Sequence, residues 1–201
     1  MSSSGWVLWI TGLPGCGKSA LAEALASALR ADGCDVRLLR MDERRKSYIP
    51  KPRYTHEERD VAYAMFAEEA AQLAGQGLGV ILDATAHRLR WRRLVRERGV
   101  RFAEIFLRCR LETAMQREAT RPDGLVMAGL YAKALQRKRG GSAPEGLGEV
   151  VGVDVPFEAD PDAECIIDND ELSLEQSVQC VLAFVRAWLD SRAGKTSCEE
   201  K

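Results

Sequence analysis

The sequence lacks the features of membrane, secreted and metal-cluster proteins. No apolar run among its 201 residues approaches 18 residues, the length that a membrane-spanning helix needs. The first five residues carry no basic region followed by an apolar one, so no secretory signal is predicted and the expected compartment is the cytoplasm. The six cysteines form no C-x-x-C pair and only two histidines could join them, so reduced thiols are favoured over disulfides or zinc.

A large charge of one sign is also lacking. Lysine and arginine number 29 against 30 aspartates and glutamates, a net charge of −1 that argues against a strongly basic nucleic-acid binder. The arginine-rich segment from Arg88 to Arg98 most simply forms a solvated helix face, with nucleic-acid contact as the alternative. An apolar content of 46% is enough for a folded core, so a globular protein is predicted.

Short apolar runs alternate with helical patterns along the chain. Strands are predicted at residues 6–10, 36–39, 80–82, 102–107 and 165–167. Helices are predicted at residues 18–30, 56–74, 88–98 and 174–189. This alternation predicts an α/β fold in which helices cover both faces of a mostly parallel sheet of about five strands.

The stretch from Leu111 to Asp160 has no strand signal and is rich in glycine between residues 140 and 148. Too few apolar residues remain there for a separate core, so we interpret it as a flexible lid and loop region of one domain spanning residues 1–190. The polar residues 191–201 are predicted to form a disordered tail.

A complete phosphate-binding loop follows the first predicted strand and precedes the first predicted helix. Its pattern is G-x-x-x-x-G-K-[ST], formed by Gly12, Leu13, Pro14, Gly15, Cys16, Gly17, Lys18 and Ser19. Glycines let successive backbone N–H groups face the phosphates, Lys18 reaches the β and γ phosphates, and the Ser19 hydroxyl ligates Mg²⁺. The pattern and its context predict a three-layer P-loop NTPase.

Two aspartates follow predicted strands at the edge of the sheet where the loop lies. Asp83 comes directly after residues 80–82 and is expected to complete the Mg²⁺ site, although it could instead cap the next helix. Asp42 follows residues 36–39 and could take a proton from an acceptor hydroxyl, with a solvated surface acid as the alternative.

Arginines in the predicted lid could neutralise a transferring phosphoryl group. Arg117 and Arg121 stand at the start of this region, and exposed helix arginines are the alternative. The chain contains neither the N-K-x-D sequence that recognises guanine nor a D-x-x-G switch, so ATP is expected rather than GTP.

From about Trp6 to Asp168 the chain resembles adenylyl-sulfate kinases, which move the γ-phosphate of ATP to the ribose 3′-hydroxyl of adenylyl sulfate. Residues 9–19 look like the family's W-x-T-G-L-x-G-x-G-K-[ST] start. Residues 129–134 are similar to its G-L-Y-x-K-A element, and residues 152–158 to its G-[IV]-D-x-P-[YF]-E element. These later motifs are much less generic than a P-loop.

The resemblance implies substrate contacts on the acceptor side. Asp42 and Arg45 match the acid and the arginine of the family's D-G-D-N-x-R segment, and Arg59 matches the arginine of F-S-x-x-D-R. Lys133 falls in the G-L-Y-x-K-A element, and Tyr54 stands where the family stacks the substrate adenine. Surface cations remain the alternative for the three basic residues.

The chain departs from the family pattern around the expected acceptor site. Met41 and Glu43 replace the glycine and asparagine of D-G-D-N, and Ala62 replaces an asparagine. Leu135 replaces an arginine, and Val150 stands in place of a phenylalanine opposite the substrate base. In addition, Asp83 falls where the family usually has serine, a feature closer to P-loop kinases that act on nucleic-acid ends or small hydroxyl compounds.

The resulting prediction is an ATP- and Mg²⁺-dependent phosphotransferase of the adenylyl-sulfate kinase type. The expected partners are ATP and a hydroxyl-bearing nucleotide or small molecule, with no membrane, and the expected assembly is a homodimer. Two alternatives stay open: a polynucleotide, nucleoside or small-metabolite kinase, and an ATP-binding regulatory module without transfer activity.

Overall fold

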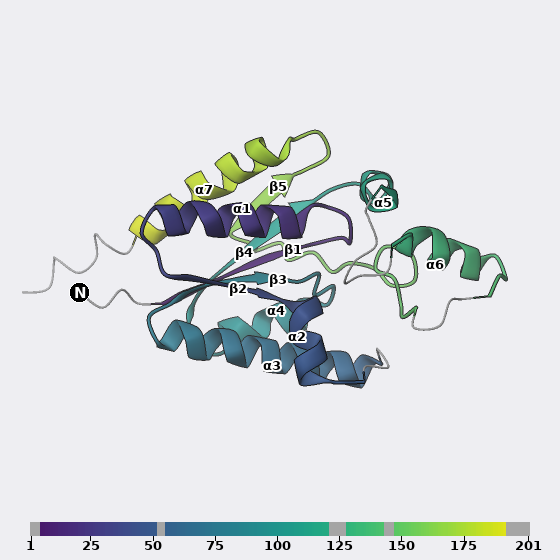
Figure 1. The fold of residues 1–201 in the computed structure, drawn as a ribbon, viewed down its shortest axis with the longest axis horizontal. Coiled ribbons are helices and arrows are strands. Elements are labelled where there is room, and N and C mark those ends of the chain that lie inside the picture. The colour runs from purple at the N-terminus through teal and green to yellow at the C-terminus, as the bar shows by residue number, and fades with distance from the viewer. Residues whose placement is uncertain (1–4, 52–54, 121–127, 143–146, 192–201) are drawn as a thin grey trace, which may run out of the picture.

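A five-stranded parallel sheet forms the centre of the protein (Figure 1). The computed structural model describes residues 5–51, 55–120, 128–142 and 147–191. The strand order is β2-β3-β1-β4-β5, and every neighbouring pair is parallel. The strands are β1 (Trp6–Gly12), β2 (Val36–Arg40), β3 (Gly79–Asp83), β4 (Arg101–Arg108) and β5 (Cys165–Asp168). The predicted parallel sheet of about five strands is therefore confirmed.

Helices cover both faces of this sheet, which makes the three predicted layers (Figure 1). One face carries α1 (Lys18–Ala31) and α7 (Leu174–Asp190), and the other carries α3 (His56–Gly75) and α4 (Leu89–Arg96). Alternate residues of β1 supply the two cores, with Leu8 and Ile10 on the α1 side and Val7 and Trp9 on the α3 side. Burial on both faces explains why β1 is continuously apolar rather than alternating.

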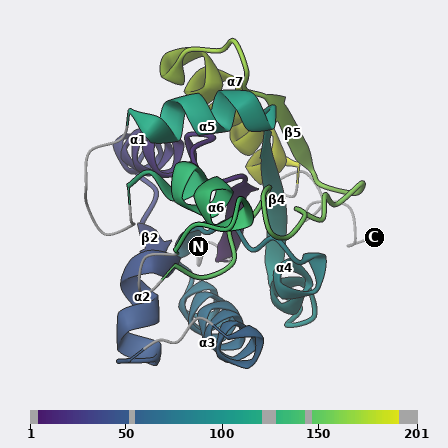
Figure 2. The same ribbon diagram turned by 90° about the vertical axis from the view of Figure 1, so that its right-hand side faces the viewer.

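One helix lies where a loop was expected. Residues between the second strand and Pro50 form α2 (Met41–Tyr48), which packs beside α3 (Figure 2). Only Met41 in this helix is buried, so its sequence carries almost no helical apolar pattern. Contacts with α3 support it instead, including a 2.9 Å ion pair between Arg44 and Glu69.

The expected lid and loop region contains two helices, α5 (Leu111–Ala119) and α6 (Leu130–Lys138). They share a small apolar cluster made of Ala114, Tyr131, Ala134 and Val150. This cluster is small, and the assignment of the stretch to one domain with the rest of the chain stays a prediction. The cluster also packs against Leu13, so it is joined to the phosphate-binding loop rather than separate from it.

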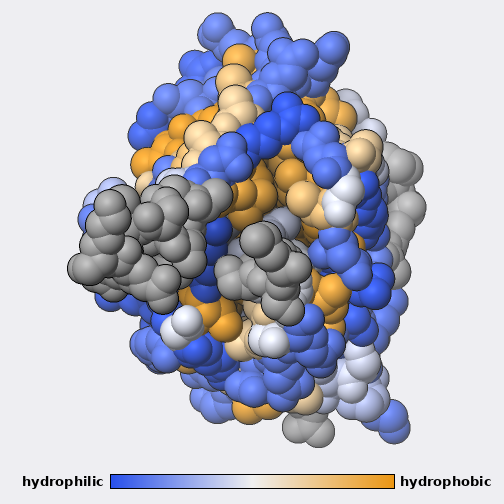
Figure 3. All heavy atoms as spheres, turned by 90° about the vertical axis from the view of Figure 1, so that its left-hand side faces the viewer, coloured by the Kyte–Doolittle hydropathy of each residue, from blue (hydrophilic) through white to orange (hydrophobic). Residues whose placement is uncertain are grey.

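The two ends of the sheet differ. The loop after β1, α5 and α6 lie beyond the carboxyl ends of the strands (Figures 1 and 2). The opposite end shows a mainly hydrophilic surface with scattered apolar side chains (Figure 3). No helix in the described parts of the chain is both long and apolar enough to cross a membrane.

Candidate active site

The loop Gly12–Ser19 curls between β1 and α1, and its glycines take conformations that other residues avoid. Gly12, Gly15 and Gly17 have φ angles of 143°, 82° and 100°. A Cβ atom on Gly15 would lie 2.3 Å from the backbone oxygen of Ala114 in α5. The glycines therefore allow both the curled backbone and the close approach of α5, as the phosphate-binding pattern requires.

Hydrogen bonds from distant elements hold the loop in this shape. The Tyr131 hydroxyl donates to the Pro14 carbonyl at 2.8 Å. The Asn169 side-chain amide donates to the Cys16 carbonyl at 2.7 Å. Within the loop, Lys18 Nζ donates to the Leu13 carbonyl at 2.8 Å. The carbonyl groups of Leu13, Pro14 and Cys16 thus accept hydrogen bonds from side chains. This arrangement leaves backbone N–H groups of the loop available for an anion.

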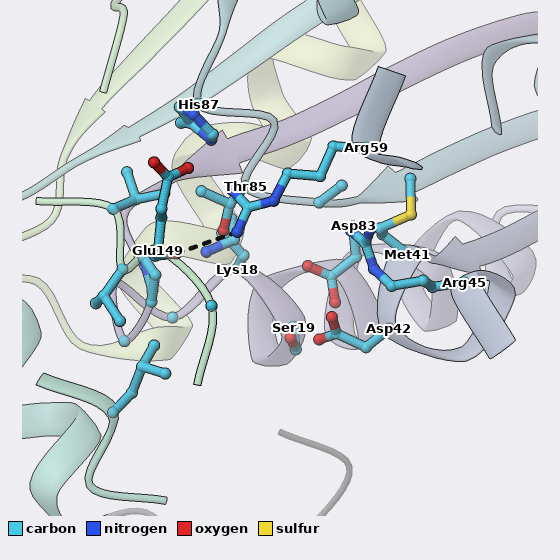
Figure 4. Close-up of a pocket in the computed structure, with 18 of the residues that line it drawn as sticks. Lys18, Ser19, Met41, Asp42, Arg45, Arg59, Asp83, Thr85, His87 and Glu149 are labelled. Atoms are coloured by element: carbon cyan, nitrogen blue, oxygen red, sulfur yellow. Dashed lines mark hydrogen bonds between the residues drawn. The ribbon is translucent and has the colours of Figure 1, made fainter. Parts of the chain in front are cut away.

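A pocket of about 640 Å³ opens beside this loop at the carboxyl ends of the strands (Figure 4). It brings together most of the predicted site residues, from six separate elements. Those that line it are Pro14, Gly15, Gly17, Lys18, Ser19, Asp42, Arg45, Arg59, Asp83 and Arg117.

One corner of the pocket gathers oxygen ligands. Asp83 ends β3, Asp42 lies in the first turn of α2, and Ser19 lies in the first turn of α1 (Figure 4). Asp83 is 8% exposed; burial raises its pKa, while Lys18 and a hydrogen bond from Ser19 act in the opposite direction. Helix α4 begins at Leu89, so Asp83 does not cap it.

These oxygens fit a hard divalent cation. Mg²⁺ is usually held by one or two carboxylates together with substrate phosphates and waters. Asp83, Asp42 and the Ser19 hydroxyl match that pattern, since all three are oxygen donors beside the phosphate-binding loop. Within the described ranges no group of three or more His, Cys, Asp or Glu side chains could hold a metal by itself.

The opposite wall is cationic and aromatic. Arg59 is buried, and its Nη2 donates to the Glu149 carbonyl at 3.2 Å. Burial lowers the pKa of Arg59 below its ordinary value, although not by enough to discharge a guanidinium. The Arg45 guanidinium lies 5.9 Å from the ring centroid of Tyr63, which stacks on Trp91.

The remaining predicted residues have different positions. Arg117 lines the pocket, and its Nη2 donates to the Asp170 carbonyl at 3.1 Å. Lys133 does not line the pocket, and its Nζ donates to the Ala128 carbonyl at 2.6 Å. Tyr54 and Arg121 lie outside the described residues.

Several pocket residues were not predicted from the sequence, among them Thr85, His87 and Glu149 (Figure 4). Thr85 and His87 follow β3 by two and four residues, so the rule that singled out Asp83 could have reached them. Glu149 precedes Val150, whose departure from the family pattern marked the same wall. The residue type of Glu149 gave no sign of a functional role.

The arginine-rich helix α4 is not simply a solvated face. Arg92 is fully buried, with Nε 2.9 Å from Oε1 of Glu104, which is also fully buried. The expectation of six solvated arginines is wrong for Arg92 because its side chain crosses beneath the helix to the sheet. Arg90 and Arg98 form ion pairs with Asp60 and Glu68 of α3.

The sequence model of the adenylylsulphate kinase family matches residues 4–168, most of the chain. The chain belongs to the adenylyl-sulfate kinase family. An adenylyl-sulfate kinase of Myxococcus xanthus is 32% identical over 188 residues, which cover 92% of each protein. A probable adenylyl-sulfate kinase of Archaeoglobus fulgidus is 31% identical over 166 residues, covering 83% of this chain and 97% of that protein.

Solved structures of this family have the same fold. The Mycobacterium tuberculosis adenylyl-sulfate kinase CysC, determined with AMPPNP and adenylyl sulfate, superimposes with a TM-score of 0.76 at 23% identity. The match covers 91% of this chain and 98% of that one. The predictions of the family, of the α/β fold and of a P-loop ATP-dependent kinase are confirmed.

Proposed function

We propose that the protein transfers the γ-phosphate of ATP to a hydroxyl group of adenylyl sulfate or of a closely related nucleotide-linked compound. The observation that carries the proposal is the pocket itself, in which the phosphate-binding loop faces Asp42 and the wall formed by Arg45 and Arg59. Donor and acceptor would then meet within one cavity, as transfer between them requires.

The donor half consists of the loop and Lys18. Backbone N–H groups of the loop would bind the β and γ phosphates, and the positive end of α1 points at the same place. Lys18 is largely buried and held at 2.8 Å from the Leu13 carbonyl, so its ammonium is already positioned at the loop. ATP as the donor follows from this arrangement and from the family.

Ser19 and Asp83 would hold Mg²⁺, and Asp42 beside them is left to the acceptor hydroxyl. When bound, Mg²⁺ neutralises charge on the β and γ phosphates and stabilises their orientation. The high pKa that burial imposes on Asp83 makes a neighbouring cation favourable, since a cation stabilises the ionised carboxylate.

Asp42 would orient the acceptor hydroxyl and accept its proton. The hydroxyl oxygen attacks the γ phosphorus, the bond from phosphorus to the oxygen bridging the β phosphate breaks, and the hydroxyl proton passes to Asp42. Because the transition state of phosphoryl transfer is loose, positioning matters more than activation of the nucleophile. Arg117 would add positive charge near the transferring group.

Arg45 and Arg59 would bind the anionic part of the acceptor. Guanidinium groups bind phosphate and sulfate oxygens through paired N–H donors, and burial of Arg59 strengthens such contacts by excluding water. It stays a prediction that Lys133 and Tyr54 contact the acceptor and that Arg121 belongs to the lid. The cytoplasmic location and the homodimer also stay predictions.

A second candidate function is a kinase for a small hydroxyl compound or a nucleic-acid end. One feature of the acceptor wall favours this second candidate. The buried Val150 lines the pocket at the position where the family pattern has phenylalanine. Loss of an aromatic partner weakens the binding of a base, by about 1 to 3 kcal/mol in single-strand binders.

A coupled assay of ADP release tests both candidates. Adenylyl sulfate, nucleosides, 5′-hydroxyl oligonucleotides and small hydroxyl compounds are each offered with ATP and Mg²⁺. Rapid turnover with adenylyl sulfate and none with the others supports the first proposal. Turnover only with another acceptor supports the second, and ATP binding without any phosphorylated product indicates a regulatory module.

A further inference from the structure

The loop of residues 84–88 joins β3 to α4 and forms one wall of the pocket. Its backbone groups are bonded to the surrounding protein. Trp9 Nε1 donates to the Ala84 carbonyl at 3.1 Å, and the Thr11 hydroxyl donates to the Thr85 carbonyl at 2.6 Å. The Ala86 N–H donates to the Tyr63 hydroxyl at 3.0 Å.

The far end of the loop is fixed as well. Arg92 donates to the Ala86 carbonyl, and the Glu158 N–H donates to the His87 carbonyl at 2.8 Å. Ala86 has a φ of 38°, and no other non-glycine residue in the described ranges has a positive φ. Such strained positions persist only where the surroundings hold them, and they concentrate at functional sites. The loop is therefore a rigid wall, and its carbonyl groups from Ala84 to His87 are already bonded within the protein.

His87 is one of these side chains, and it has an unused polar atom. The residue lines the pocket and is 4% exposed (Figure 4). Its ring meets the face of Trp91 edge-on, with centroids 4.9 Å apart and planes at 89°. Its Nε2 is buried and has no hydrogen-bond partner among the described residues. An unpaired buried nitrogen is costly, so a group that enters the pocket and bonds to it gains affinity.

The surroundings keep the imidazole neutral. Burial, Arg59 and Arg88 lower the pKa of His87 to about 4, against a smaller opposing effect of Glu158, and His56 contributes least. A neutral imidazole has one N–H donor and one acceptor nitrogen. It therefore suits a neutral polar group of a ligand, whereas the neighbouring Arg59 suits an anionic one.

We propose that His87 determines acceptor specificity by hydrogen-bonding a neutral group on the base or sugar of adenylyl sulfate, beside the anionic part held by Arg59. The inference rests on the proposed function, since it assigns a contact to that acceptor. It also gives a physical account of the pocket wall in which Val150 replaces the phenylalanine of the family pattern. Where Val150 provides no stacking surface, a directional hydrogen bond from a rigid loop provides recognition instead.

Steady-state kinetics of three variants test the proposal. His87→Phe keeps a ring against Trp91 but removes both nitrogens, and His87→Gln restores a hydrogen-bonding amide. The expected result is a rise of about five- to tenfold in the KM for adenylyl sulfate in His87→Phe, partly reversed in His87→Gln. The KM for ATP and kcat stay within about twofold. The matched control is His56→Gln: His56 is exposed and does not line the pocket, although its Nε2 lies 3.5 Å from the Glu149 carboxylate, and the KM values of this variant are expected to stay within about twofold of wild type.

Histidine ring NMR of the wild-type protein gives a second readout that does not depend on the folding of a His87 variant. The chain has two histidines, so the ring ¹⁵N signals are assigned by comparison with His56→Gln. With ADP and Mg²⁺ present, added adenylyl sulfate is expected to shift the Nε2 signal of His87 and to leave that of His56 in place.

The outcomes separate the two proposals. Binding of adenylyl sulfate by calorimetry with an unmoved His87 signal, or with an unchanged KM in His87→Phe, overturns the role of His87 and leaves the proposed function intact. Equal losses in kcat and in both KM values indicate a structural role and also overturn it. No binding of adenylyl sulfate to the wild-type protein refutes the proposed acceptor, and this inference with it.

Discussion

The side-chain amide of Asn169 donates a 2.7 Å hydrogen bond to the carbonyl of Cys16, a residue 153 positions away in the phosphate-binding loop. Asn169 directly follows β5, and its own side-chain oxygen accepts a 2.7 Å hydrogen bond from Ser177 of α7. This buried relay ties the loop that would bind nucleotide to the last strand and the last helix. The carboxyl-terminal elements therefore take part in shaping the donor site.

Replacement of Asn169 by alanine should loosen that loop. We expect the free energy of unfolding to fall by about 1 to 3 kcal/mol, because the Cys16 carbonyl and the Ser177 hydroxyl both lose a partner. ADP should also bind more weakly, as calorimetry would measure. Ser177→Ala should have a smaller effect on ADP affinity, since it leaves the bond to Cys16 in place. Equal ADP affinity in Asn169→Ala and wild type would contradict the relay.

Replacement of Lys18 by alanine should abolish phosphoryl transfer without unfolding the protein. The lysine ammonium donates to the Leu13 carbonyl and to Cys16 Sγ, both within the loop, so little of the core depends on it. Turnover is measured by ADP release and folding by circular dichroism. Lys138→Ala, on α6 and outside the pocket, serves as the control and should retain activity. Wild-type turnover by Lys18→Ala would refute the donor site.

Asp42→Asn should lower kcat by roughly 10² or more, the usual contribution of a positioned acid-base group. The amide keeps the size of the side chain but cannot accept the hydroxyl proton. Glu43 is a matched control because it is adjacent, pairs with Arg40 at 3.1 Å and does not line the pocket. Glu43→Gln should leave kcat nearly unchanged. An unaltered rate in Asp42→Asn would remove Asp42 from the mechanism.

The buried pair of Arg92 and Glu104 should show strong coupling in urea unfolding. Arg92→Met leaves the Glu104 carboxylate buried without its cation, and we expect a loss of about 3 to 5 kcal/mol in the free energy of unfolding. The double variant Arg92→Met/Glu104→Gln removes both charges and should lose less than the sum of the single variants. Strict additivity would show that the two side chains do not interact.

The neutral state of His87 should make stability depend on pH in a defined window. Its pKa is lowered from 6.5 to about 4 in the folded protein, so between these values the unfolded chain binds more protons. The contribution to stability is therefore complete above pH 6.5 and is lost as the pH falls toward 4, by at most about 3 kcal/mol.

The difference between wild type and His87→Phe isolates this effect, because carboxylates that titrate in the same range are common to both proteins. The wild-type protein should lose more of its free energy of unfolding than His87→Phe when urea titrations at pH 7 and pH 4.5 are compared. His56→Gln should behave like wild type. Parallel losses in all three proteins would show that His87 titrates normally.

The short-range pattern of the sequence was sufficient to predict the strands of the sheet and the phosphate-binding loop. Each predicted strand lies within the observed one, and in β1 and β3 continuous burial on both faces leaves a continuous apolar run. Local patterning failed at α2, where only Met41 is buried and contacts with α3 take the place of an apolar face.

The acceptor wall was harder to predict because its residues come from separate elements. Arg45 and Arg59 were identified only through the resemblance to a known family, whereas the position of Asp42 after a predicted strand had already marked it as a possible proton acceptor. His87 has no motif, and its significance depends on a buried nitrogen without a partner and on the rigid loop that carries it. Neither property can be seen in the order of amino acids.

By itself the sequence determined the phosphate-binding loop, since the geometry of such a loop depends on glycine, lysine and serine at adjacent positions of one short segment, and the family motifs at residues 129–134 and 152–158 indicated a kinase. The tertiary structure decided how the acceptor side is built. It places Arg59, His87 and Glu149 around one pocket, and such contacts between distant residues depend on how the strands are ordered and on which helices pack across them.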